Sequence, residues 1–176
     1  FDECGIPTFA FINGLALGGG LEVGLHCKYR TLSATAFTGL PEVFLGLVPG
    51  WGGATILPML IGPEKAVQVI IANALNNNTM MKAKDALALG VVDAVFDPAD
   101  FLERSIGFAV GVLNGTTKID RADYSNDPAW ETALATGKAA ALKKYGGATI
   151  AWLEGGVGRA TPITVNHRIN AVAFIP

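Results

Sequence analysis

The chain has 176 residues, 51% of them hydrophobic and only 16% charged, which is enough apolar material for one domain with a sizeable core. Its net charge of -2 and the lack of a basic run argue against a nucleic-acid-binding protein. The most apolar stretch, residues 43–62, is interrupted by Pro49, Pro58 and several glycines, which excludes an ordinary membrane-spanning helix.

The first half of the chain alternates short apolar runs with glycine-rich turns, a pattern typical of an α/β domain. The predicted elements are, in chain order, a buried strand at residues 6–12, a turn at 13–14, a helix at 21–27, short strands at 29–33 and 36–37, and a loop-rich stretch at 39–53.

The second half is predicted to be mainly helical. Helices are expected at residues 64–74, 81–89, 99–113 and 129–145, with Gly90 as a C-cap and one strand at 91–96. Residues 1–113 should therefore form one α/β unit, with 114–128 as a linker or surface loop and 129–147 as a helical segment. Residues 148–176 show no clear period and are left unassigned.

Three glycines, Gly18 to Gly20, separate a strand-like run from a predicted helix. Backbone N–H groups at a helix N-terminus are free to bind an anion or a developing oxyanion. A nucleotide loop is a weaker reading, because the glycine spacing of a dinucleotide fingerprint and a P-loop lysine are both missing. The glycines could instead serve only close packing.

Two acids stand close to such loops. Glu22 follows Gly19 by three residues and should project from the same face of the first helical turn, although an acid there often only complements the helix dipole. Glu42 lies among apolar residues and turn formers. It is either a buried carboxyl group with a raised pKa or a loop carboxylate in solvent.

Histidine, cysteine and metal chemistry are not expected. His26 and Cys27 are adjacent on the predicted helix and do not face each other, so both are interpreted as packing residues. No spacing of metal ligands occurs. The cysteines, Cys4 and Cys27, show no disulfide framework, so we expect reduced thiols in a cytoplasmic protein.

At this point the sequence resembles the crotonase superfamily of enoyl-CoA hydratases and isomerases. Residues 12–22 resemble the family's signature around its first catalytic acid, and residues 39–53 resemble the signature around the second. Residues 84–93 also match a helix-to-strand stretch of the family. The resemblance covers about the first hundred residues.

The resemblance implies the C-terminal part of a spiral of β-β-α turns with a helical appendage. It also implies an acyl-CoA thioester as the substrate, no separate cofactor, and assembly as trimers or within a fatty-acid oxidation complex. Gly19 would donate its N–H to the thioester oxygen, while Glu22 and Glu42 would hold and activate water. The residues expected to contact the substrate are Gly18, Gly20, Pro41, Gly50 and Trp51.

Because both acids are present, the resemblance favours enoyl-CoA hydration in fatty-acid β-oxidation. The alternatives are a Δ3,Δ2-enoyl-CoA isomerase and a non-catalytic scaffold or RNA-binding member of the fold. Trp51 and the later polar segment resemble the hydratase part of a multifunctional protein. NAD would be needed only if such a parent protein has a downstream dehydrogenase module.

The sequence departs from the family pattern at Lys28, where an acid is common, and at residues 54–56, where polar or basic residues are usual. The resemblance also places a second oxyanion donor and most CoA contacts upstream of Phe1. We therefore expect the 176 residues alone to show little hydratase activity.

Overall fold

The computed structural model describes residues 4–45, 47–124, 128–145, 150–152 and 172–174. Two three-stranded sheets organise the first hundred residues. The first sheet has the order β1-β3-β6, all parallel, and is formed by Phe9–Ile12, Tyr29–Ser33 and Ala94–Phe96. The second has the order β2-β4-β5 and is formed by Ala16–Leu17, Phe37–Gly39 and Met81–Lys82.

The chain passes through these sheets in a repeating order. It runs from β1 in the first sheet to β2 in the second, through helix α1 (Gly19–His26), and then again from β3 to β4. Each turn thus adds a strand to each sheet, and β1 pairs with β3 just as β2 pairs with β4, in parallel. This is the β-β-α winding that the resemblance implied, and the mixed α/β class is confirmed.

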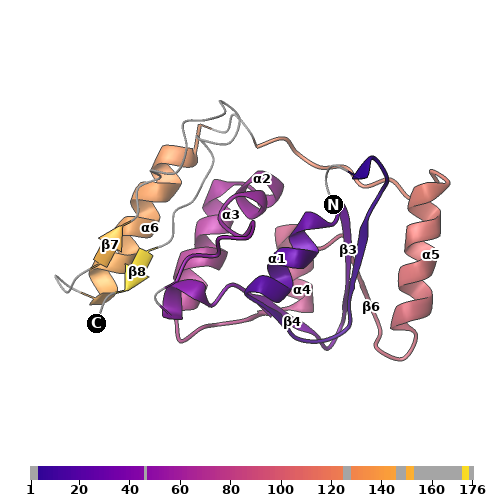
Figure 1. Ribbon diagram of the computed structural model, residues 1–176, viewed down its shortest axis with the longest axis horizontal. Coiled ribbons are helices and arrows are strands. Elements are labelled where there is room, and N and C mark those ends of the chain that lie inside the picture. The colour runs from indigo at the N-terminus through magenta and orange to yellow at the C-terminus, as the bar shows by residue number, and fades with distance from the viewer. Residues whose placement is uncertain (1–3, 46, 125–127, 146–149, 153–171, 175–176) are drawn as a thin grey trace.

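Helices cover both sides of the first sheet, with α5 (Phe101–Leu113) on one side and α1 and α4 (Ala83–Leu89) on the other (Figure 1). The remaining helical elements are η2 (Glu42–Leu45), α2 (Ile56–Ile61), α3 (Pro63–Val67), the π-helical turn η3 (Gln68–Asn73) and α6 (Trp130–Tyr145). The hydrophobic core joins α1 to α2, α3 and η3 through residues that include Leu21, Leu25, Leu57, Ile61 and Ile70. This packing fixes α1, which carries the candidate site.

Several predicted boundaries were wrong for identifiable reasons. The predicted helix at 81–89 begins at Ala83, because Met81 and Lys82 pair with β4 in an antiparallel bridge. The predicted helix at 64–74 changes from α to π geometry at Gln68. The helix predicted from residue 21 already begins at Gly19. Gly90 does cap α4 in the left-handed conformation, with a φ of 86°, as its position predicted.

The predicted C-terminal helix is present as α6, and it packs against the domain. Trp130 and Ala133 belong to the core cluster, and the Trp130 indole donates a hydrogen bond of 3.1 Å to the carbonyl of Tyr124. In the unassigned tail, strands β7 (Ile150–Trp152) and β8 (Val172–Phe174) pair in antiparallel fashion. The rest of that tail lies outside the described residues, and the division at 113 and 128 remains a prediction.

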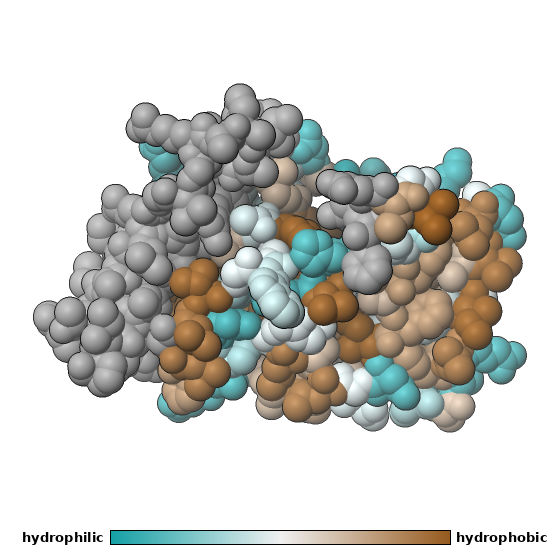
Figure 2. All heavy atoms as spheres, in the orientation of Figure 1, coloured by the Kyte–Doolittle hydropathy of each residue, from teal (hydrophilic) through white to brown (hydrophobic). Residues whose placement is uncertain are grey.

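The outer face of α5 is apolar. Leu102, Ile106, Val110 and Leu113 recur at helical spacing and are all exposed, and Figure 2 shows apolar surface on this side of the molecule.

Within the described part of the chain, every helix is too short or too polar to cross a membrane.

Candidate active site

The glycine triplet builds the start of α1. Gly18 is the N-cap, with a φ of 53° and a ψ of -127°, a conformation that residues with a side chain rarely adopt. Its N–H donates to the carbonyl of Gly39 at 3.0 Å, which ties the loop to the end of β4. Gly19 is therefore the first helical residue, and its N–H is among the helix-start donors that have no acceptor within the helix.

Glu22 is buried in the first turn of α1, with 4% of its surface exposed. Its Oε1 atom accepts hydrogen bonds from the backbone N–H groups of Trp51, at 2.8 Å, and Gly53, at 2.9 Å. A buried carboxylate is costly unless such donors satisfy it. The two amides hold the Glu22 side chain in one orientation and attach the 51–53 loop to α1.

Glu42 begins η2 and is also buried, with 9% exposed. Its Oε2 atom has no hydrogen-bond partner among the described residues. Burial raises the pKa of Glu42, the nearby Glu22 carboxylate raises it further, and the Glu42 backbone N–H opposes the shift. Because its side chain is buried, Glu42 is not a loop carboxylate in solvent, and its raised pKa makes the neutral form more accessible than in an ordinary glutamate.

The structure thus places the two acids of the sequence motifs close enough to interact electrostatically. Their environments differ, because Glu22 accepts two backbone hydrogen bonds and Glu42 is desolvated by burial. The absence of a side chain at Gly18 leaves room for the Glu42 carboxyl group, because a Cβ atom at position 18 would lie 2.7 Å from the Glu42 Oε1 atom. Two neighbouring acids in unlike environments can divide the roles of proton donor and proton acceptor.

His26 contributes to this site, although it was interpreted as a packing residue. Its Nε2 atom lies 2.7 Å from the carbonyl oxygen of Trp51, so the ring holds the same peptide segment that Glu22 binds through N–H groups. His26 lies four residues after Glu22 and so on the same helix face. This spacing of four residues is the feature of the sequence that could have indicated a role for His26 beside Glu22. Cys27 is buried, as expected of a packing residue.

The other predicted substrate contacts lie on the same two glycine-rich segments of the chain as these acids. Trp51 is 73% exposed, and its Cε3 atom is 3.9 Å from the position of a Cβ at Gly19. Gly20 and Gly50 are exposed, and the Pro41 ring lies beside Gly18. Their contact with substrate remains a prediction. In the described ranges, no three His, Cys, Asp or Glu side chains are grouped so that they could hold a metal ion.

The close approach at Gly18 predicts a large effect of a side chain at this position. Gly18→Ala should displace the Glu42 carboxyl group and strain the backbone, whereas a Cβ at Gly107, exposed on α5, would have nothing within 4 Å. For hydration of crotonyl-CoA, the reaction that the resemblance implies, we expect Gly18→Ala to lower kcat about tenfold or more, as a displacement of about 1 Å can cost up to 10²-fold. Gly107→Ala, the matched control on a different element, should keep near-normal turnover. Equal kcat values for the two variants would contradict this role of Gly18.

Comparison with known proteins supports the family that the sequence motifs indicated. Residues 1–142 match the family model described as enoyl-CoA hydratase/isomerase. The fatty acid oxidation complex subunit alpha of Pseudomonas paraeruginosa is 46% identical over 115 residues, which cover 65% of this chain and 15% of that protein. The chain therefore spans about 15% of the length of the curated relatives it matches.

Solved structures resemble the chain in fold. An enoyl-CoA hydratase from Bacillus anthracis has a TM-score of 0.58 and 29% identity, covering 82% of this chain and 54% of that one. An enoyl-CoA hydratase from Mycobacterium avium has a TM-score of 0.54 and 30% identity, covering 61% and 46%. Together with the winding of the two sheets and the match over residues 1–142, this shows that the chain belongs to the enoyl-CoA hydratase/isomerase family.

Proposed function

We propose that this domain adds water across the C2–C3 double bond of a 2-enoyl-CoA thioester. The observation that carries the proposal is the pair of buried acids in unlike environments, with Glu22 fixed by two amides and Glu42 shifted toward its neutral form. Both stand beside the start of α1, where the Gly19 N–H is available to a carbonyl oxygen. The names of the matched relatives support this chemistry.

The reaction can be assigned to these groups step by step. A water oxygen bonds to C3 as Glu22 accepts one of its protons, and the π electrons of the double bond move toward the thioester oxygen. The Gly19 N–H stabilises the negative charge that develops there. As that charge returns, C2 takes a proton from the Glu42 carboxyl group, which gives the 3-hydroxyacyl thioester. Glu22 then holds the proton that came from water.

The proposal includes an acyl-CoA ligand and assembly into an oligomer or a fatty-acid oxidation complex. The first relatives are named as subunits of such a complex. The apolar outer face of α5 and the low share of charged residues are consistent with a protein surface that is covered by other chains.

Replacement of Glu22 separates hydration from isomerisation. A Δ3,Δ2-isomerase needs one acid to move a proton between carbon atoms, whereas hydration also needs a group that activates water. In the intact protein we expect Glu22→Gln to lower kcat for crotonyl-CoA hydration about 10²-fold or more, with a smaller change in KM. Loss of the conjugated absorbance measures the rate. Isomerisation of a 3-enoyl-CoA that survives in the variant, with no hydration in the parent, would instead identify an isomerase.

His26 is expected to act as a positioning residue for Glu22. Loss of its hydrogen bond to the Trp51 carbonyl should loosen the segment that orients the carboxylate. We expect His26→Ala to lower kcat about fivefold, the equivalent of one hydrogen bond, with little change in KM. His26→Gln, which can restore an N–H donor, should recover most of the loss. A glutamine variant as impaired as the alanine variant would show that only ring packing matters.

A further inference from the structure

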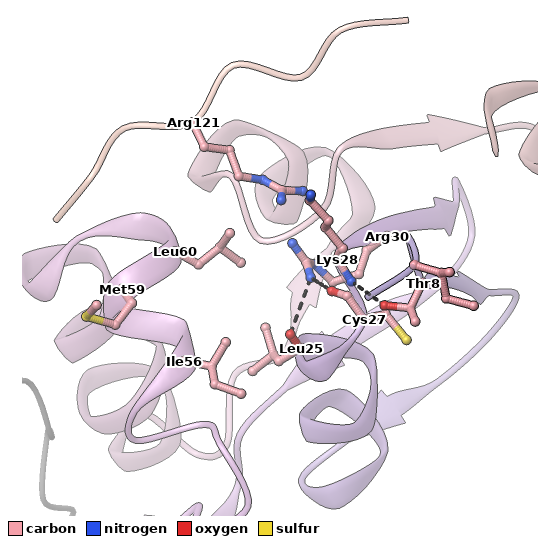
Figure 3. A pocket seen from close by; sticks show the side chains of 10 residues that line it. Thr8, Leu25, Cys27, Lys28, Arg30, Ile56, Met59, Leu60 and Arg121 are labelled. Atoms are coloured by element: carbon pink, nitrogen blue, oxygen red, sulfur yellow. Dashed lines mark hydrogen bonds between the residues drawn. The ribbon is translucent and has the colours of Figure 1, made fainter. Parts of the chain in front are cut away.

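A pocket of about 420 Å³ lies at the C-terminal end of α1, whereas Gly19 and Glu22 lie in its first turn. Its size is within the range of small-molecule sites. Cationic side chains, Lys28, Arg30 and Arg121, lie on one side of it, and α2 presents Ile56 and Leu60 from the other side (Figure 3). The hydration chemistry uses none of these residues.

Arg30 is the buried cation of this pocket, with only 2% of its surface exposed. Its Nε atom donates to the carbonyl of Val91 at 2.8 Å, and its Nη1 atom donates to the carbonyls of Cys27 and Leu25. Its Nη2 atom is buried and has no hydrogen-bond partner among the described residues. Burial lowers the pKa of Arg30 to about 10, which reflects the cost of placing this charge there.

The carbonyl contacts suggest a simpler role for Arg30 as a cap on the last turn of α1. That role accounts for the Nη1 atom, because C-terminal carbonyls of a helix favour a cation, while the Nε atom is occupied by the Val91 carbonyl. It leaves the Nη2 donors unused. It also does not explain why two further cations border the same space.

Those two cations leave the pocket with excess positive charge. Arg121 forms an ion pair with Asp93 at 2.6 Å, and the other Asp93 oxygen accepts the backbone N–H of Arg30 at 2.7 Å. Lys28 is exposed, and its backbone N–H is fixed by the Thr8 hydroxyl. Among the described residues, the lining of this pocket thus includes three cationic side chains and no carboxylate, and no carboxylate forms an ion pair with Arg30.

We propose that this pocket binds a small organic anion whose carboxylate or phosphate group is held by Arg30, with Lys28 and Arg121 at the rim. A guanidinium with two free N–H groups suits an oxyanion. The half-buried side chains of Ile56, Met59 and Leu60 would contact a short alkyl group attached to it. The site is separate from the proposed hydration and does not depend on it.

Isothermal titration of the full chain with hexyl phosphate, hexanoate, inorganic phosphate and hexanol tests the proposal. We expect saturable binding of at least one of the two hexyl anions, weaker binding of inorganic phosphate, no binding of hexanol, and a lower affinity at high salt. The first two ligands distinguish a phosphate from a carboxylate site. Hexanol affinity equal to that of the better anion, or no saturable binding of either hexyl anion, would overturn the proposal.

Variants locate the binding. Lys28→Gln alters an exposed side chain and should weaken the affinity for the better-bound hexyl anion about fivefold or more, as expected for a charged contact. Arg30→Lys keeps the charge and loses the planar donors, so it should weaken affinity about tenfold. Lys84→Gln, on an exposed position of α4, removes the same charge away from the pocket and should have no effect. Equal affinity in Lys28→Gln and Lys84→Gln would place the anion elsewhere, even if Arg30→Lys fails to fold.

Discussion

Glu42→Gln in the intact protein is expected to lower kcat for crotonyl-CoA hydration by about 10²–10⁴-fold, with a much smaller change in KM. Glutamine occupies almost the same space but has no proton to give to C2. The buried position of Glu42 and the raised pKa of its carboxyl group suit it to deliver that proton. Glu64→Gln, at an exposed position on α3, is the matched control and should leave kcat unchanged. Near-normal hydration by Glu42→Gln would remove Glu42 from the mechanism.

The same variant has an expected effect on stability that depends on pH. The pKa of Glu42 is raised in the folded protein, so the unfolded chain ionises first as the pH rises above the ordinary glutamate pKa. Stability due to the neutral carboxyl group is complete below that value and is lost as the pH rises toward the folded pKa. Glu42→Gln should therefore melt higher than the parent at pH 7, and this gain should shrink near pH 4. A gain that is equal at both pH values would contradict a raised pKa.

Gly19→Pro is expected to lower kcat by about 10²–10³-fold, because proline removes the N–H proposed to meet the thioester oxygen. Gly19 is the first residue of α1, a position at which proline is compatible with a helix. The variant should therefore fold, which thermal melting would verify. Gly19→Ala is the matched control, since it keeps the N–H and its Cβ would be in ordinary contact, 3.9 Å from Trp51.

The kinetic comparison of the two variants isolates the backbone donor. If Gly19→Ala retains most of the hydratase activity while Gly19→Pro loses it, the N–H group contributes to the transition state. If both variants are folded and equally active, the glycine serves close packing alone, which was the alternative left open by the sequence.

The sequence alone predicted the parts of the site that depend on neighbouring residues. Glycines before an amphipathic segment predicted a helix start with free donors, and that start lies at Gly19. The glycine at position 90 predicted a left-handed helix cap, which is confirmed. The motifs around Glu22 and Glu42 predicted the family, because two long patterns at a fixed separation are far more specific than either one. These features are local, because each depends on residues that are close together in the sequence.

Contacts between residues that are far apart in the sequence could be identified only from the tertiary structure. Glu22 accepts hydrogen bonds from the amides of Trp51 and Gly53, which lie 29 and 31 residues further along the chain. His26 contacts the carbonyl of Trp51 on the same loop. The choice between a solvated and a buried Glu42 depended on tertiary packing too, because desolvation and a second carboxylate together set its pKa. Met81 and Lys82 form a strand rather than the start of a helix because they pair with β4 in antiparallel fashion. The periodicity of apolar residues predicts whether a segment is a helix or a strand and which of its sides is buried. Which other segment packs against that side is known only from the tertiary structure.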